Sequence, residues 1–168
     1  AIALHDADIL TYDRLLLARL FYPVVNPNFN YRFCKGYYYR SNGKQLGGRV
    51  VRLLMTPLLR TLKKFCGPME YLEYLDSFRY PLAGEFSMRA DVVKTIRIPS
   101  DWGLEVGILS EVHRNNSLNR ICQVDIADRY DHKHQPVSED NPDKGLSRMT
   151  FDIARAIYIK LAQNGIVF

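Results

Sequence analysis

Cysteine is scarce in this chain, and no long hydrophobic run occurs in it. The three cysteines, Cys34, Cys66 and Cys122, lie far apart and in no Cys-x-x-Cys spacing, which argues against a disulfide framework and against sulfur ligands for a metal. Such cysteines are typical of reduced thiols, so we expect a cytoplasmic protein. No apolar stretch approaches the roughly 18 residues that cross a bilayer, so we expect a soluble protein without a membrane partner.

Several common catalytic motifs are also missing. The sequence contains no P-loop, no Gly-x-Gly-x-x-Gly, no Gly-x-Ser-x-Gly, no zinc-type array of Cys and His, and no internal repeat. The net charge is +5, but lysine and arginine are spread along the chain and form no basic helix. We therefore expect no nucleic-acid partner, while a modest positive excess suits small phosphorylated substrates.

The composition is sufficient for one hydrophobic core. With 168 residues, 47% of them hydrophobic, the sequence predicts a single domain over residues 1–168. The chain opens inside an apolar segment, with no methionine, cap or loop before it. We therefore expect that an N-terminal portion is missing from this sequence.

The first ten residues predict a short apolar strand that runs into two carboxylates, Asp6 and Asp8. An Asp-x-Asp at the end of a buried strand offers hard oxygen ligands that can hold Mg²⁺ or Mn²⁺ against a diphosphate. A carboxylate after a strand is also a common N-cap of the next helix. The motif alone leaves both interpretations open.

Patterning further along the chain predicts alternating helices and strands. Proline is expected to end the first helix before Pro23, and Ser147 to cap the last one. A polar loop is expected over 138–145. The helices are predicted over 13–20, 49–65, 68–77, 89–95, 104–113 and 147–164, and the strands over 1–5, 31–40, 85–88 and 121–127.

Three segments between these elements carry candidate ligand-binding groups. Paired glycines before Arg49 suggest an anion cradle at a helix N-terminus, or merely a flexible turn. Gly84 beside Glu85 would let a ligand approach the backbone closely. Glu105, in the first turn of an apolar helix, either serves the helix dipole or meets a ligand hydroxyl.

Two histidines, His132 and His134, follow the last predicted strand. On an extended segment they project the same way, and a neutral imidazole is a common metal ligand. A solvated polar loop is the alternative.

Five segments of the chain follow the order and spacing of one known family. They are Asp6-Ala7-Asp8, Gly47-Gly48-Arg49, and residues 81–86, 102–107 and 129–134. Together they resemble the glucosyl-3-phosphoglycerate synthases, which are retaining glycosyltransferases of the GT-A fold. The resemblance implies an α/β fold with a mixed sheet and flanking helices, covering the acceptor side of the family fold from the Asp-x-Asp onward. A helical extension would occupy residues 138–168, and the nucleotide-binding N-terminal half would be absent.

The resemblance also implies roles for individual residues. Catalytic roles fall to Asp8, Glu105 and Arg129. A divalent ion, Mg²⁺ or Mn²⁺, would be held by Asp8 and His132. The donor nucleotide sugar would be bound by Asp6, Asp8, Leu82, Gly84, Glu85 and Glu105, and the acceptor 3-phosphoglycerate by Gly48, Arg49, Val51 and His134.

The chain departs from the family pattern at two places. Val51 stands where the family has a threonine, so one hydrogen bond to the acceptor is either missing or supplied by another group. The segment before His132 is one residue longer, which leaves open whether His132 or His134 is the metal ligand; we favour His132.

The implied reaction is transfer of glucose from UDP-glucose to 3-phosphoglycerate by a homodimeric enzyme. Two alternatives remain. One is a mannosyl-3-phosphoglycerate synthase that uses GDP-mannose, because the base of the donor is recognised mainly by the missing half. The other is a non-catalytic fragment that binds acceptor or serves as a dimerisation module.

Overall fold

One mixed four-stranded sheet organises the computed structural model, which describes residues 1–39, 47–131 and 145–166. The strand order is β1-β3-β2-β4. The β3 strand is antiparallel to both β1 and β2, whereas β2 and β4 are parallel, with Cys34 opposite Cys122. The strands are β1 (Ile2–Leu4), β2 (Phe33–Tyr38), β3 (Phe86–Met88) and β4 (Ile121–Ala127).

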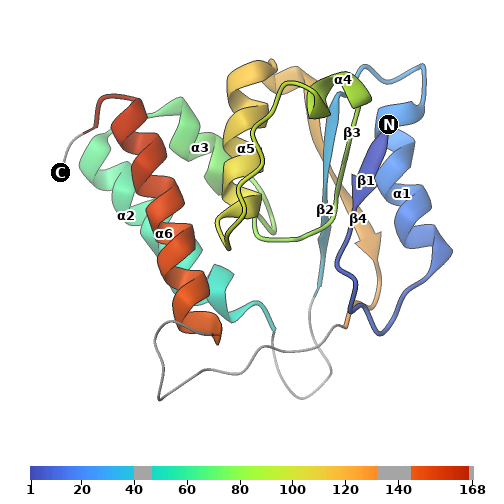
Figure 1. Ribbon diagram of the computed structural model, residues 1–168, viewed down its shortest axis with the longest axis horizontal. Coiled ribbons are helices and arrows are strands. Elements are labelled where there is room, and N and C mark those ends of the chain that lie inside the picture. The colour runs from blue at the N-terminus through green and yellow to red at the C-terminus, as the bar shows by residue number, and fades with distance from the viewer. Residues whose placement is uncertain (40–46, 132–144, 167–168) are drawn as a thin grey trace.

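Helices cover both faces of this sheet, which gives three layers (Figure 1). The α1 helix lies on one face, and α2, α3, α5 and α6 lie together on the other. The helices are α1 (Arg14–Val25), a π-helix (Val51–Met55) that continues into α2 (Thr56–Cys66), α3 (Glu70–Asp76), α4 (Ala90–Val93), α5 (Leu104–Asn115), a 3₁₀ helix (Leu118–Arg120) and α6 (Gly145–Gln163).

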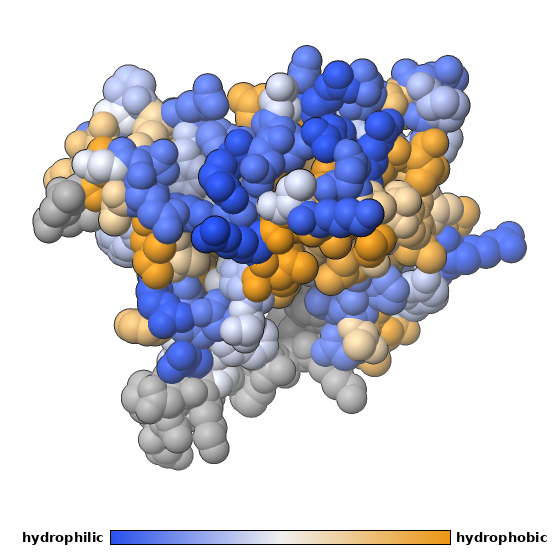
Figure 2. Space-filling model, turned by 45° about the horizontal axis from the view of Figure 1, so that its top comes forward, coloured by the Kyte–Doolittle hydropathy of each residue, from blue (hydrophilic) through white to orange (hydrophobic). Residues whose placement is uncertain are grey.

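Two hydrophobic clusters, one on each face, hold the layers together. Successive residues of a strand point to opposite faces, so Phe33 joins the larger cluster with Leu109 and Ile153, while Cys34 joins Leu16 and other side chains of α1. Polar residues surround these clusters at the surface: in the view of Figure 2 hydrophilic residues cover most of the area and hydrophobic ones gather near its middle. In the part of the chain that the structure describes, no helix has both the length and the hydrophobicity needed to cross a membrane.

Two helix ends differ from the sequence-based prediction. The first helix was expected to end before Pro23, but α1 continues to Val25. Proline removes one backbone hydrogen bond, and burial of Leu20 and Val24 against the sheet offsets that loss. The last helix begins at Gly145, so Ser147 lies within its first turn and does not cap it. Hydrophobic periodicity fixes the face of a helix more firmly than its first residue.

The N-cap of α1 gives a first testable prediction. The Asp13 carboxylate accepts a hydrogen bond from the Leu15 amide at 2.8 Å, which satisfies one of the free amides at the helix start. We expect Asp13→Ala to lower the free energy of unfolding by about 1 kcal/mol, measured by urea denaturation. Asp13→Asn keeps the acceptor and should cost far less; equal losses in the two variants would contradict the capping role.

Candidate active site

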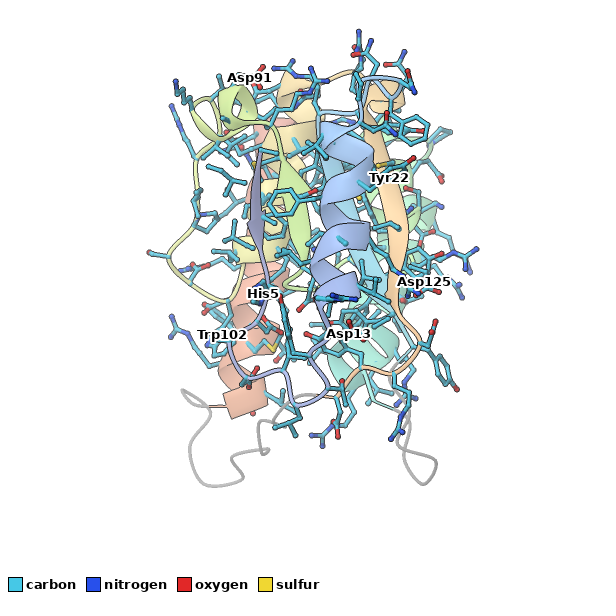
Figure 3. All side chains as sticks on the ribbon, turned by 90° about the vertical axis from the view of Figure 1, so that its right-hand side faces the viewer. His5, Asp13, Tyr22, Asp91, Trp102 and Asp125 are labelled. Atoms are coloured by element: carbon cyan, nitrogen blue, oxygen red, sulfur yellow. The ribbon has the colours of Figure 1, made fainter. Side chains whose placement is uncertain are left out.

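The predicted site residues come from loops that meet at one end of the sheet. In Figure 3 His5, which follows β1, Asp13, which precedes α1, and Trp102, which precedes α5, lie toward the same end of the molecule, whereas Asp91 lies at the other. The loop after β1, the loop before β3 and the start of α5 therefore supply side chains to a common region.

The Asp6 side chain is in close contact with Gly84. A Cβ atom added to Gly84 would lie 2.2 Å from Asp6 Oδ1, closer than any real contact, so only glycine lets the carboxylate approach this backbone. The Asp6 amide also donates a hydrogen bond to Glu85 Oε1 at 3.3 Å. The structure thus brings together three of the residues that the sequence predicted to bind the donor.

Glu85 is fully buried and is held by a tyrosine that the sequence analysis did not single out. The Tyr130 hydroxyl donates a hydrogen bond to Glu85 Oε1, and the Tyr130 ring stacks on Tyr38 with ring centroids 3.5 Å apart. Burial, followed by the charge of Glu85, raises the pKa of Tyr130, which therefore stays a donor. Among the described residues, Glu85 Oε2 has no hydrogen-bond partner although it is buried. An unpaired buried carboxylate oxygen is costly and favours a nearby hydrogen-bond donor.

Lys35 is the second residue that the sequence analysis missed. Its side chain is 1% exposed, and its ammonium group donates a hydrogen bond to the Ala83 carbonyl. Burial lowers the pKa of Lys35 to about 8, while the charges of Glu105, Glu85 and Asp6 act in the opposite direction. A lysine within the otherwise uncharged strand Phe33–Tyr38 was the available signal.

Glu105 faces the same group of charges from the first turn of α5. Its side chain is partly buried, and burial raises its pKa. The positive charge of Lys35 and the backbone amide of Glu105 itself oppose that rise, whereas the carboxylates of Asp6 and Glu85 add to it. The helix-dipole role and the ligand-binding role considered for Glu105 are therefore compatible. We call Asp6, Lys35, Glu85 and Glu105 the charged cluster.

Gly48, the second glycine of the pair before the π-helix, lies next to Tyr80. Gly48 has φ of 71°, a conformation that favours glycine, and its Cα faces the Tyr80 ring. Tyr80 packs edge-on against Tyr38, with ring centroids 5.1 Å apart, which links this loop to the tyrosine stack. Arg49 is exposed, whereas the Val51 side chain belongs to the larger hydrophobic cluster.

The end of β4 runs beside the loop that carries Asp8. The Leu10 amide donates to the Asp131 carbonyl at 2.8 Å, and the Asp131 amide donates to the Thr11 hydroxyl at 3.0 Å. Arg129, two residues earlier, is exposed, and Asp8 is partly buried.

The two histidines cannot be placed beside Asp8 directly, because His132 and His134 lie outside the described residues. Over residues 1–39, 47–131 and 145–166, no group of three or more His, Cys, Asp or Glu side chains could hold a metal ion. The predicted metal site, and the choice between the two histidines, therefore remain predictions. The remaining predicted donor ligand, Leu82, is buried next to Ala83.

The lowered pKa of Lys35 predicts a pH dependence of stability. Between the folded value near 8 and the ordinary value of 10.5, the unfolded chain binds more protons at this residue than the folded chain, so stability rises with pH. We expect the unfolding free energy of wild type, minus that of Lys35→Met, to increase from pH 8 to 9.5, with a slope approaching about 1.4 kcal/mol per pH unit. Urea denaturation across this range measures it, and a flat difference would contradict the lowered pKa.

The contact between Gly84 and Asp6 predicts a coupled pair of mutations. We expect Gly84→Ala to destabilise the fold by about 1–3 kcal/mol, because the new methyl group overlaps the Asp6 carboxylate. In an Asp6→Ala background the same change should cost at least about 1 kcal/mol less. Urea denaturation of the four proteins gives the coupling, and purely additive losses would show that the overlap is not with Asp6.

Comparison with known proteins relates this chain to the glucosyl-3-phosphoglycerate synthases. No protein-family model matches the chain. The glucosyl-3-phosphoglycerate synthase of Persephonella marina is 51% identical over all 168 residues, and that of Methanococcoides burtonii is 50% identical over 155 residues, or 91% of this chain. The chain spans only 41% and 38% of the length of these two relatives.

Solved structures agree with this relationship. Glucosyl-3-phosphoglycerate synthase from Mycobacterium tuberculosis, in complex with Mn²⁺, UDP-glucose and phosphoglyceric acid, matches 99% of this chain and 50% of its own, with a TM-score of 0.73 and 22% identity. Mannosyl-3-phosphoglycerate synthase from Rubrobacter xylanophilus matches 97% of this chain and 46% of its own, with a TM-score of 0.73 and 28% identity. The α/β fold class with a mixed sheet is confirmed. The chain is thus homologous, over its whole length, to a part of the glucosyl-3-phosphoglycerate synthases, and it has the fold of that part.

Proposed function

We propose that the native protein containing this chain is a metal-dependent retaining glycosyltransferase that moves glucose from UDP-glucose to 3-phosphoglycerate. One observation carries the proposal. In this chain, which is 51% identical to an enzyme of that name, Asp6 packs on Gly84 within a buried charged cluster, at the sheet end where Asp8 also lies.

The donor set suits a hard divalent cation. Asp8 would supply a carboxylate oxygen, the ligand type that Mn²⁺ and Mg²⁺ prefer, and His132 an imidazole nitrogen, a common metal ligand. The Mycobacterium tuberculosis enzyme has been solved with each of these ions. When bound, the ion neutralises the diphosphate leaving group. Arg129, exposed beside the same loop, would add positive charge near that group.

The sugar subsite follows from the loop before β3. The unpaired Glu85 Oε2 needs a hydrogen-bond donor, which is what a sugar hydroxyl offers. The backbone from Leu82 to Gly84 would line the same subsite, and Glu105 would contact further hydroxyls. In a retaining transfer the acceptor hydroxyl would attack C1 from the face that the diphosphate leaves, and its proton would pass to the departing diphosphate oxygen. These residues would therefore orient the sugar and need not remove a proton.

The acceptor subsite would lie at the glycine pair and Arg49. Gly48 turns the chain with positive φ, and the exposed Arg49 guanidinium is suited to bidentate recognition of a phosphate or carboxylate. The Mycobacterium tuberculosis enzyme has been solved with phosphoglyceric acid and with glycerol 3-phosphate. Because the Val51 side chain lies in the core, only its backbone could contact the acceptor, and His134 would complete the subsite.

We also propose a cytoplasmic homodimer. The long α6 helix presents Phe151 and Ile159, which are 60% and 49% exposed, and apolar side chains of this kind suit packing against a second copy.

A second candidate function is supported by one specific observation. The Rubrobacter xylanophilus structure, at 28% identity, is a mannosyl-3-phosphoglycerate synthase. The protein would then transfer mannose from GDP-mannose, or accept both donors, because the region described here reads sugar hydroxyls and phosphates rather than the base. A non-catalytic acceptor-binding module is the remaining alternative.

Turnover and its dependence on Asp8 test the proposal. With Mg²⁺, UDP-glucose and 3-phosphoglycerate, we expect UDP release that requires the acceptor, stops when the metal is chelated and resumes when it is restored. Asp8→Asn should lower kcat by about 100-fold or more while the fold is retained, because a metal ligand is lost.

Asp91→Asn is the matched control, since Asp91 pairs with Arg32 at the opposite end of the molecule. Its activity should equal that of the wild type. UDP release unaffected by Asp8→Asn would contradict the role of Asp8 as a metal ligand. Release of GDP from GDP-mannose, with no release of UDP from UDP-glucose, would favour the mannosyl enzyme. No release from either donor, with 3-phosphoglycerate still bound in calorimetry, would identify a non-catalytic module.

A further inference from the structure

Lys35 stands out among the described residues because its charge is fully buried at the proposed sugar subsite. Burying an ammonium group is costly unless carbonyl or carboxylate groups compensate it. Its ammonium group donates a hydrogen bond to the Ala83 carbonyl, in the middle of the segment that the proposed function assigns to the sugar. The charges that act on it most strongly are those of Glu105, then Glu85, then Asp6.

The surrounding geometry locks this lysine in place. Phe86 packs beneath it, with Nζ 5.4 Å from the ring centroid. The neighbouring Gly36 amide donates to the Glu85 carbonyl at 2.8 Å, and a Cβ at Gly36 would lie 3.0 Å from Glu85 Cβ. The β2 strand therefore lies in close contact with the loop before β3, through the Gly36 backbone and the Lys35 ammonium group.

We propose that Lys35 is a positioning residue of the site: through its hydrogen bond to the Ala83 carbonyl it fixes the backbone of residues 82–85. This inference rests on the proposed function, because it assumes that the 82–85 backbone meets the donor sugar. It has two parts, one about turnover and one about the loop.

Turnover tests the first part. In the native protein containing this chain, we expect Lys35→Met to lower kcat by about 100-fold, because displacing an orienting group by about 1 Å has effects of this size. Lys35→Gln should keep kcat within about threefold of wild type, since it keeps a donor for the Ala83 carbonyl. Equal losses in the two variants would overturn this part, because the hydrogen bond would then not be what positions the loop.

Amide hydrogen exchange tests the part about the loop. We expect Lys35→Met to speed exchange at Ala83, Gly84 and Glu85 by about tenfold or more, with β4 amides unchanged, because one anchor of the loop is lost. Unchanged exchange over the loop would overturn the inference. Where wild type itself shows no turnover, the proposed function fails and this measurement alone decides whether Lys35 positions the loop.

Two further variants guard the comparison. Lys63→Met removes another paired lysine, on α2, whose partners Glu73 and Asp76 lie near the helix surface. It should leave kcat within about twofold and loop exchange unaltered, as for other surface changes. Should Lys35→Met fail to fold, Lys35→Gln keeps a donor for the Ala83 carbonyl but no charge. It should then retain both loop protection and turnover, and a loss of both would contradict the role of the hydrogen bond.

Discussion

A buried ammonium group among three carboxylates is the interaction on which the site depends. Lys35 stays mainly protonated at neutral pH although burial lowers its pKa to about 8, and Glu85 is buried in the loop before β3. Removing either partner would leave an uncompensated buried charge, which costs more than the pair gains. The strand that carries Lys35 and the loop that carries Glu85 must therefore keep their relative position for the chain to fold.

Glycine makes that position possible at two points of close approach. Gly36 lets β2 lie against Glu85, and Gly84 lets the Asp6 carboxylate rest on the loop backbone. The tyrosine stack closes the other side, because Tyr130 both donates to Glu85 and packs on Tyr38. Folding and arrangement of the candidate site are thus one event: the contacts that bury the charge also fix the direction in which Asp6 and Glu105 point.

Local pattern accounts for what the sequence could predict. Carboxylates after a strand, and a glycine beside Glu85, singled out Asp6, Gly84 and Glu85, which the structure brings together, because those signals lie within a few adjacent residues. Lys35 and Tyr130 escaped because their roles arise from partners far away in the chain: Lys35 bonds 48 residues on, and Tyr130 bonds 45 residues back. The one local signal, a lysine in an otherwise uncharged strand, does not by itself show that the side chain is buried. The same holds for α1, whose passage beyond Pro23 is decided by packing on the sheet.

The balance of charge at this end of the sheet suits a cation. Asp6, Glu85 and Glu105 bring three carboxylates together around Lys35, and Asp8 lies in the loop that carries Asp6. Under the proposed function, a diphosphate entering such a field would be repelled, since Arg49 and Arg129 are exposed, where solvent screens their charge. A divalent ion held by Asp8 would supply positive charge that offsets this repulsion. The excess of negative charge would therefore make binding of a nucleotide sugar depend on the metal before any chemistry begins.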